Sequence, residues 1–179
     1  MTIEVIFEAH SSSLHNDNHL SSGWFDVDLS ELGIQHSLDL GRRYQKHHID
    51  VIFCSDLKRS YRTAEIAFGD KIPTIKDPRL RECNYGEYNC FPKEFVDQEK
   101  MKRIKIPFPN GESYSETLER MNSFLTFLLE THNNKRVLII GHRATQYGLE
   151  YWINKRPVKQ ILSDTWVWQP GWIYILQKI

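Results

Sequence analysis

The chain has 179 residues, of which 40% are hydrophobic, so a single domain spanning residues 1–179 can bury a hydrophobic core. Lys and Arg total 23, as do Asp and Glu, which excludes an overall field favouring nucleic acid or an anionic membrane as the main partner. No apolar run approaches the roughly 18 residues of a membrane span, no leader pattern precedes the first strand, and the three cysteines lack CxxC spacing, so we expect a cytoplasmic protein with reduced thiols.

The first elements alternate between apolar and amphipathic character. Residues 3–7 predict a buried strand, and the Ser-, His- and Asn-rich stretch 11–22 predicts a functional loop. Ser30 can cap a helix that ends in the basic stretch 42–48. Its spacing predicts a core-facing side made of Ile34, Leu38, Gly41 and Tyr44.

Residues 49–53 predict a second strand, and Cys54-Ser55-Asp56 offers N-cap chemistry for a helix over 57–68. A short strand and loop within 69–79 lead to Arg79-Leu80-Arg81-Glu82, after which the pattern weakens as far as residue 111.

Ser113 or Ser115 can open the next helix, with a core-facing stripe at Leu118, Met121, Leu125 and Leu128. A strand over 137–140 and a helix over about 144–153 follow. Residues 166–176 place a Pro-Gly turn between two aromatic-rich runs, which predicts a hairpin.

These elements predict an α/β fold of three layers. We expect a mostly parallel central sheet with helices on both faces and a C-terminal antiparallel hairpin or edge strand. His10 and His142 each follow a predicted strand. Ligands bind beyond the carboxyl ends of strands in such sheets, so the two imidazoles are expected to share one site despite their separation in sequence.

Several short motifs occur in a characteristic order. Glu8-Ala9-His10-Ser11 is followed by Asn16, Gly23-Trp24 and Ser55-Asp56-Leu57-Lys58-Arg59, and then by the segment around Glu82, by Asn110-Gly111-Glu112-Ser113 and by Gly141-His142. This set, over roughly residues 3–150, resembles the histidine phosphatase superfamily of phosphoglycerate mutase-like proteins. The resemblance implies that His10 is the phosphorylated residue, that His142 and Asn16 contact phosphoryl oxygens, and that Glu82 donates a proton.

The same residues suit phosphoryl transfer by their own chemistry. A neutral imidazole such as that of His10 is a good nucleophile for covalent catalysis, although a capped or solvent-facing loop histidine is the alternative. Arg59 lies in the first turn of a predicted helix, where backbone N–H groups and a guanidinium together favour phosphate. Ser11 and Gly23 are further candidates for binding phosphate or substrate. For Glu82, general acid catalysis competes with an ion pair to Arg79 or Arg81.

One position departs from the family pattern. Where the family has an arginine directly before the nucleophilic histidine, this chain has Ala9. Loss of such a donor typically lowers the rate about 10²- to 10³-fold. Arg143, directly after His142, is our candidate to supply the missing charge; alternatively it points to solvent or pairs with an acid such as Glu8.

Two further features border the predicted site. Basic residues and aromatic residues are interleaved between 91 and 108, which suggests either a lid selective for phosphorylated substrates with an apolar portion or simply a solvated face. Trp166 and Trp168 are expected to pack in the core or the hairpin rather than to contact substrate.

The favoured function is a metal-independent phosphomonoester phosphatase that needs no cofactor and acts on a small phosphorylated metabolite. The alternative is a catalytically impaired phospholigand-binding or regulatory protein, with a mutase-type phosphotransferase next and a metal hydrolase disfavoured because no clustered metal-ligand motif occurs. The sequence is compatible with a homodimer.

Overall fold

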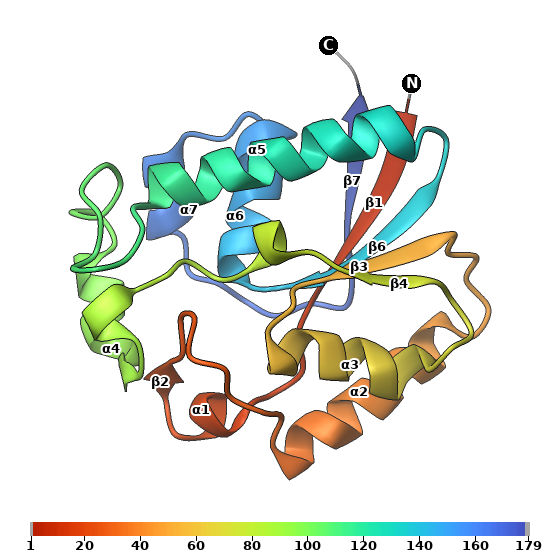
Figure 1. Cartoon of the computed structure of the whole chain (residues 1–179), viewed down its shortest axis with the longest axis horizontal. Coiled ribbons are helices and arrows are strands. Elements are labelled where there is room, and N and C mark those ends of the chain that lie inside the picture. The colour runs from red at the N-terminus through yellow and green to blue at the C-terminus, as the bar shows by residue number, and fades with distance from the viewer. Residues whose placement is uncertain (1, 178–179) are drawn as a thin grey trace.

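A computed structural model describes residues 2–177. Its elements alternate between strands and helices through most of the chain, as Figure 1 shows. In chain order they are β1 (Thr2–Ala9), α1 (Leu14–Asp17), β2 (Leu20–Ser21), α2 (Glu31–Tyr44), β3 (Val51–Cys54), α3 (Lys58–Phe68), β4 (Thr74–Lys76), the 3₁₀ turns η1 (Pro78–Leu80) and η2 (Gly86–Tyr88), β5 (Phe91–Pro92), α4 (Lys93–Glu99), α5 (Tyr114–Thr131), β6 (Arg136–Gly141), α6 (Arg143–Trp152), α7 (Val158–Ser163) and β7 (Trp172–Gln177).

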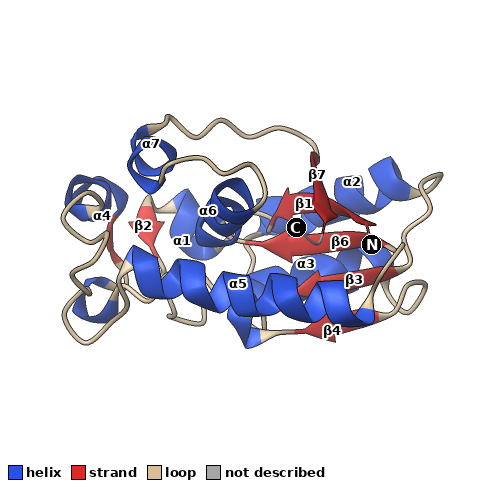
Figure 2. Cartoon of the chain, turned by 90° about the horizontal axis from the view of Figure 1, so that it is seen from above, coloured by secondary structure: helices blue, strands red, loops and turns tan. Residues whose placement is uncertain are grey.

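The main sheet has the strand order β4-β3-β6-β1-β7. β1, β3, β4 and β6 run parallel, and β7 pairs antiparallel with β1 at the edge. Helices α2 and α3 cover one face and α5 and α6 the other, which gives three layers (Figure 2). The predicted fold class is confirmed. Within residues 2–177, no helix is both long and apolar enough to cross a membrane.

The C-terminal hairpin does not form, although its second arm does. Residues 164–171 have no regular secondary structure, and β7 pairs with β1 rather than with the run that precedes the Pro-Gly turn. The antiparallel edge strand is therefore confirmed, whereas the hairpin prediction was wrong. The physical reason is that the free edge of β1 pairs with every residue of β7.

The core-facing side of α2 agrees with the prediction at Tyr44, which packs against the core, and at Gly41, where a Cβ would lie 2.3 Å from the Ala67 carbonyl oxygen, but differs at the other two positions. Ile34 and Leu38 are each 39% exposed, and Gly33, Ser37 and Leu40 are buried instead. A Cβ atom at Gly33 would lie 1.9 Å from the Ser12 carbonyl oxygen. This side of α2 therefore packs close against neighbouring backbone, a contact that small residues permit and that an apolar periodicity count does not detect.

The N-terminus of α3 is capped by a distant residue. Of the three residues predicted to offer N-cap chemistry, Asp56 instead accepts two hydrogen bonds from the guanidinium of Arg81, at 2.7 and 2.6 Å, whereas Ser55 Oγ accepts one from the backbone N–H of Leu57 at 3.2 Å. Asp26 takes over part of that role by accepting a hydrogen bond from the backbone N–H of Lys58 at 2.7 Å. By contrast, α5 begins at Ser113, one of the two predicted starts, with a capping box between Ser113 and Glu116. The predicted apolar stripe of this helix is buried.

Candidate active site

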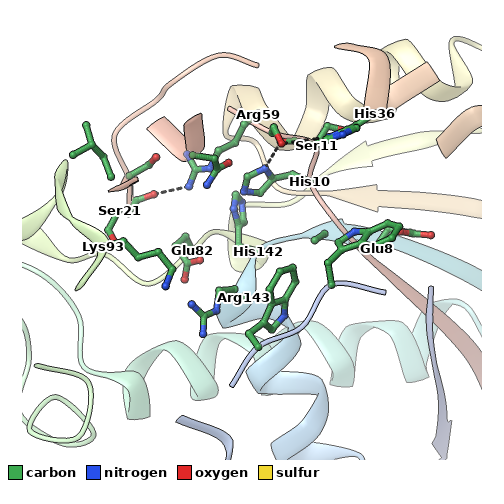
Figure 3. A pocket seen from close by; sticks show the side chains of 18 of the residues that line it. Glu8, His10, Ser11, Ser21, His36, Arg59, Glu82, Lys93, His142 and Arg143 are labelled. Carbon is green, nitrogen blue, oxygen red and sulfur yellow. Dashed lines mark hydrogen bonds between the residues drawn. The ribbon is translucent and has the colours of Figure 1, made fainter. Parts of the chain in front are cut away.

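Two adjacent parallel strands bring the two histidines together. Ala9 at the end of β1 pairs in register with Gly141 at the end of β6, and the backbone N–H of His10 donates to the Gly141 carbonyl at 2.9 Å. The ring centroids of His10 and His142 are consequently 4.9 Å apart (Figure 3). Both line one cavity of about 680 Å³ at the carboxyl end of the sheet, where the sequence placed them.

His10 is held in the tautomer that a nucleophile requires. Its Nδ1 lies 2.7 Å from the carbonyl oxygen of Ser11. A carbonyl only accepts, so Nδ1 carries the hydrogen and Nε2 keeps its lone pair. Burial lowers the pKa of His10 to about 3, and the positive charge of Arg59 acts in the same direction. The ring is therefore neutral at physiological pH.

His142 presents two free nitrogens. Its side chain is buried, and neither ring nitrogen has a hydrogen-bond partner within the described part of the chain. Burial, followed by the charge of Arg59, lowers its pKa well below the usual value for histidine. A buried polar atom without a partner is unfavourable, so the free nitrogens indicate a ligand-facing position.

Arg59 forms the cationic floor of the cavity. Its side chain is 2% exposed, with Nη1 donating to the Phe25 carbonyl at 3.1 Å and Nη2 to the Gly23 carbonyl at 2.8 Å. Burial lowers the pKa of Arg59 to about 10, which still leaves it charged at neutral pH. Gly23 has φ +52°, and a Cβ there would lie 1.9 Å from Asn89 Oδ1, so only glycine can place this carbonyl.

The predicted loop residues Ser11 and Asn16 also line the cavity. The Ser11 backbone N–H donates to Thr63 Oγ1 at 3.0 Å, and its hydroxyl accepts a hydrogen bond from Ser37 at 2.8 Å. Asn16 Oδ1 accepts from both the backbone and the hydroxyl of Ser13. The carboxamide is thereby fixed with its NH₂ group as the part available to a ligand.

Glu82 lies across the cavity from His10 and is not part of an ion pair with its neighbours. Its Oε1 accepts from the backbone N–H groups of Cys83, at 2.8 Å, and Ala144, at 3.3 Å. Arg79 pairs with Asp77 and Arg81 with Asp56. The ion-pair alternative for Glu82 was therefore wrong, and its carboxyl faces the cavity (Figure 3).

Arg120 holds this segment in place, and the sequence reasoning missed it. Its guanidinium pairs with Glu112 and donates to the backbone carbonyls of Arg79, Arg81 and Glu82. The available signal was Glu112, which belonged to the recognised motifs, but nothing in the spacing linked it to a residue on the following helix.

Arg143 turns into the cavity. Its guanidinium carbon lies 5.8 Å from the centroid of Tyr147 and 5.9 Å from that of Trp166, and Nη1 is 3.9 Å from Asp97. The side chain is 24% exposed, and Nε is buried without a partner in the described residues. The solvent-facing alternative for Arg143 is wrong. Pairing with an acid is confirmed, although the acid is Asp97 rather than Glu8, and the side chain lines the cavity at the same time.

Glu8 lines the cavity on the side of α2 and is neutralised by two residues of that helix. Its Oε1 accepts from Tyr44 Oη at 2.8 Å and from Arg43 Nη2 at 3.1 Å. Burial raises the pKa of this carboxyl, although both partners oppose the change. The Glu8 charge therefore does not stand unpaired beside the nucleophile.

The basic segment divides into two groups. Lys93 and Lys100 line the cavity and both pair with Asp97, whereas Lys102 pairs with Glu99 at the surface. Together with Arg143, three cations surround one carboxylate and leave this side of the cavity positive. Helix α4 therefore borders the site as a cover would, while the remaining basic residues fit the solvated-face alternative.

Trp166 and Trp168 lie elsewhere than expected. Both line the cavity, although Trp166 also packs against Trp172 at 6.0 Å. The segment that carries them has no regular secondary structure, so no periodicity signalled this position. Among the described residues, no three His, Cys, Asp or Glu side chains gather where they could share a metal ion.

Comparison with known proteins gives a consistent family. The profile of the histidine phosphatase superfamily (branch 1) matches residues 5–166. Phosphoserine phosphatase 1 of Hydrogenobacter thermophilus is 32% identical over 78% of this chain and 71% of its own length. A 2,3-bisphosphoglycerate-dependent phosphoglycerate mutase of a Methylobacterium species is 30% identical, with 91% of this chain and 93% of the mutase covered.

Solved structures agree on the fold. Bacillus stearothermophilus YhfR superposes with a TM-score of 0.84 at 23% identity, covering 97% of this chain and 90% of that chain. The α-ribazole phosphatase of Shigella flexneri gives 0.76 at 22% identity, with 88% and 83% covered. Profile, relatives and fold together show that the chain belongs to branch 1 of the histidine phosphatase superfamily.

Proposed function

We propose that the protein is a phosphomonoester phosphatase that works through a phosphohistidine on His10, without a metal ion. The observation that carries the proposal is the neutral His10 ring, with Nε2 unprotonated, 4.9 Å from His142 and in one cavity with Arg59 and Glu82. Membership of a family whose relatives are named as phosphatases and mutases supports phosphoryl transfer as the chemistry of this site.

In the first step, His10 Nε2 attacks phosphorus and the bond from phosphorus to the alcohol oxygen breaks. Glu82 donates its proton to the departing oxygen. In the second step, water attacks the phosphohistidine, Glu82 takes the proton of that water, and inorganic phosphate leaves with His10 neutral again. Splitting the displacement in this way lowers the barrier of each half.

Charge on the phosphoryl oxygens must be stabilised throughout. Arg59 supplies a fixed guanidinium, the Asn16 amide and one N–H of His142 supply donors, and a bound phosphoryl dianion favours a second proton on His142. Arg143 supplies the charge that Ala9 does not, because its guanidinium faces the cavity and its Nε has no partner among residues 2–177.

The positive side of the cavity supports an anionic small-molecule substrate. Three cationic side chains, those of Lys93, Lys100 and Arg143, surround the carboxylate of Asp97. Such an excess of positive charge raises the local concentration of phosphorylated metabolites.

The test is incubation of the purified protein with a panel of phosphomonoesters in the presence of EDTA, alongside His10→Ala. We expect release of inorganic phosphate and an acid-labile phosphoenzyme from the wild type, and neither from the variant. Equal activity of the variant would refute the mechanism.

Two outcomes of the same assay select other functions. Ala9 favours a second candidate, a binding protein without turnover, and phosphate binding with no phosphoenzyme would support it. Phosphoryl transfer between 2- and 3-phosphoglycerate that exceeds phosphate release would instead indicate a mutase.

A further inference from the structure

The cavity extends well beyond the groups that would hold a phosphoryl group. Its volume of about 680 Å³ lies within the range of sites for whole small molecules, roughly 300–1,000 Å³. Figure 3 shows Lys93 and Glu82 on one side of His10, and Glu8 and His36 on the other. The α2 side of the cavity is thus free to hold part of the substrate other than its phosphate.

The segment 164–171 forms a wall of this cavity. Trp166 and Trp168 line it, whereas Val167 between them is 73% exposed, as expected for an extended chain whose alternate side chains face opposite ways. Near its start the segment is held by a hydrogen bond, because Trp166 Nε1 donates to Gln146 at 2.7 Å. At its end Gly171 has φ +64° and passes so close to α2 that a Cβ there would lie 3.0 Å from Tyr44 Oη.

The two indoles have different surroundings. Trp166 has Arg143 over its ring at 5.9 Å and packs against Trp172 at 6.0 Å, so it contacts protein groups on more than one side. Trp168 is 52% exposed and has the Arg43 guanidinium 5.7 Å from its centroid. Trp168 therefore has ring surface available to a ligand.

Arg43 adds a directional donor beside this indole. Its Nη2 is bound to Glu8, but its Nε is buried and has no partner in the described part of the chain. Because Glu8 neutralises Arg43, and Arg42 neutralises Asp39 next to them, this side has no excess charge to attract a second anion. An indole face and one free N–H instead match a neutral planar ring that carries a hydrogen-bond acceptor.

We propose that Trp168 and Arg43 form a subsite for the alcohol half of the substrate, and that it selects phosphomonoesters of alcohols bearing a planar heteroaromatic ring. The ring stacks on Trp168, and a ring nitrogen or carbonyl accepts from Arg43 Nε. This inference rests on the proposed phosphatase function for its placement next to the reacting phosphorus. It does not depend on whether Arg143 or another group completes the phosphoryl site.

A matched pair of substrates tests the subsite. Adenosine 5′-monophosphate and ribose 5-phosphate release the same kind of primary alcohol, so their reactivity differs little and the ring is the main variable. We expect the wild type to have the higher kcat/KM for the nucleotide. Trp168→Ala should lower kcat/KM for the nucleotide about tenfold, the order expected for loss of one aromatic stacking contact, and leave that for ribose 5-phosphate unchanged.

The control variants are Trp168→Phe, which keeps a ring, and Val167→Ala, which changes the outward neighbour; both should retain the preference. Equal kcat/KM values in the wild type, or an equal loss for both substrates in Trp168→Ala, would overturn the subsite while leaving phosphatase activity intact.

If no phosphomonoester is hydrolysed, the proposed function fails, and calorimetric binding of the same two compounds decides the inference. Tighter binding of the nucleotide that is lost in Trp168→Ala supports the subsite, and equal binding refutes it.

Discussion

The guanidinium carbon of Arg143 lies 5.9 Å from the ring centroid of Trp166, which packs in turn on Trp172. Trp172 and Ala9 both pack against the same core cluster, and Ala9 and Arg143 line the same cavity. This relationship gives a physical reason to expect that the cation needed by the phosphoryl group now comes from β6-α6 rather than from β1.

We therefore expect Arg143→Ala to lower kcat/KM by about 10²- to 10³-fold, or ~2.7–4 kcal/mol, the usual effect of removing one transition-state donor. Thermal unfolding should change little, because the guanidinium contributes a long ion pair to Asp97 and two ring contacts at 5.8 and 5.9 Å. Arg62→Ala is the control, since Arg62 pairs with Glu65 at the surface and does not line the cavity. Activity of Arg143→Ala within twofold of wild type would exclude Arg143 from the phosphoryl site.

Two glycines with positive φ allow the effect of backbone strain to be measured separately from the effect of packing. Gly23 and Gly69 have φ of +52° and +54°, but a Cβ at Gly69 meets nothing within 4 Å, whereas one at Gly23 meets Asn89 at 1.9 Å. Gly69 combines φ +54° with ψ −135°, a backbone conformation that side chains disfavour, so we expect Gly69→Ala to destabilise the fold by about 1–3 kcal/mol and to leave kcat unchanged.

Gly23→Ala should destabilise by more and also lower kcat, because the displaced carbonyl no longer holds Arg59. Urea unfolding and steady-state kinetics of both variants provide the measurement. Equal effects of the two substitutions would show that the Arg59 contact with Gly23 has no role in catalysis.

The sequence was sufficient to predict that His10 and His142 share one site, because both residues follow strands and the carboxyl ends of parallel strands meet at one edge of the sheet. The sequence was insufficient to predict which side of α2 faces the core. Gly33 and Ser37 are buried there, and at Gly33 the neighbouring backbone leaves no room for a larger side chain such as that of Ile34 or Leu38. This preference for small residues depends on distances in the folded protein, so the spacing of apolar residues in the sequence does not reveal it.

The same limit applies to the cavity wall. Trp168 belongs to a segment without regular structure, so its direction depends on the hydrogen bond from Trp166 to Gln146 and on the close approach of Gly171 to Tyr44, both of them far away in sequence. Arg120 likewise binds backbone carbonyls of a distant loop, and such contacts have no side-chain signature.

The buried histidines predict a pH-dependent stability. The pKa of His10 falls to about 3 on folding, so below pH 6.5 the unfolded chain binds a proton that the folded chain does not. Stability is therefore full above pH 6.5 and declines as pH falls toward 3, with a slope of up to about 1.4 kcal/mol per pH unit for one such group. His142 acts in the same direction.

Urea unfolding at pH 7, 6 and 5 measures this slope, and His10→Ala should flatten it. An identical pH dependence in the wild type and the variant would contradict a neutral buried His10. Imidazole NMR signals give an independent reading, since His10 should remain in its neutral Nδ1–H form at pH 5.

Glu82 offers the sharpest test of the proposed proton transfer. Glu82→Gln keeps an oxygen that can accept from the backbone N–H groups of Cys83 and Ala144, so the loop conformation should persist. The variant cannot donate a carboxyl proton. We therefore expect kcat/KM, which reports formation of the phosphohistidine and not its hydrolysis, to fall about 10²- to 10⁴-fold for alkyl phosphates, whose alkoxide leaves poorly without protonation, and far less for p-nitrophenyl phosphate, whose phenolate leaves unaided. A uniform loss with both substrates would mean that Glu82 positions the substrate rather than protonating the leaving group, because only proton donation depends on the basicity of the departing oxygen.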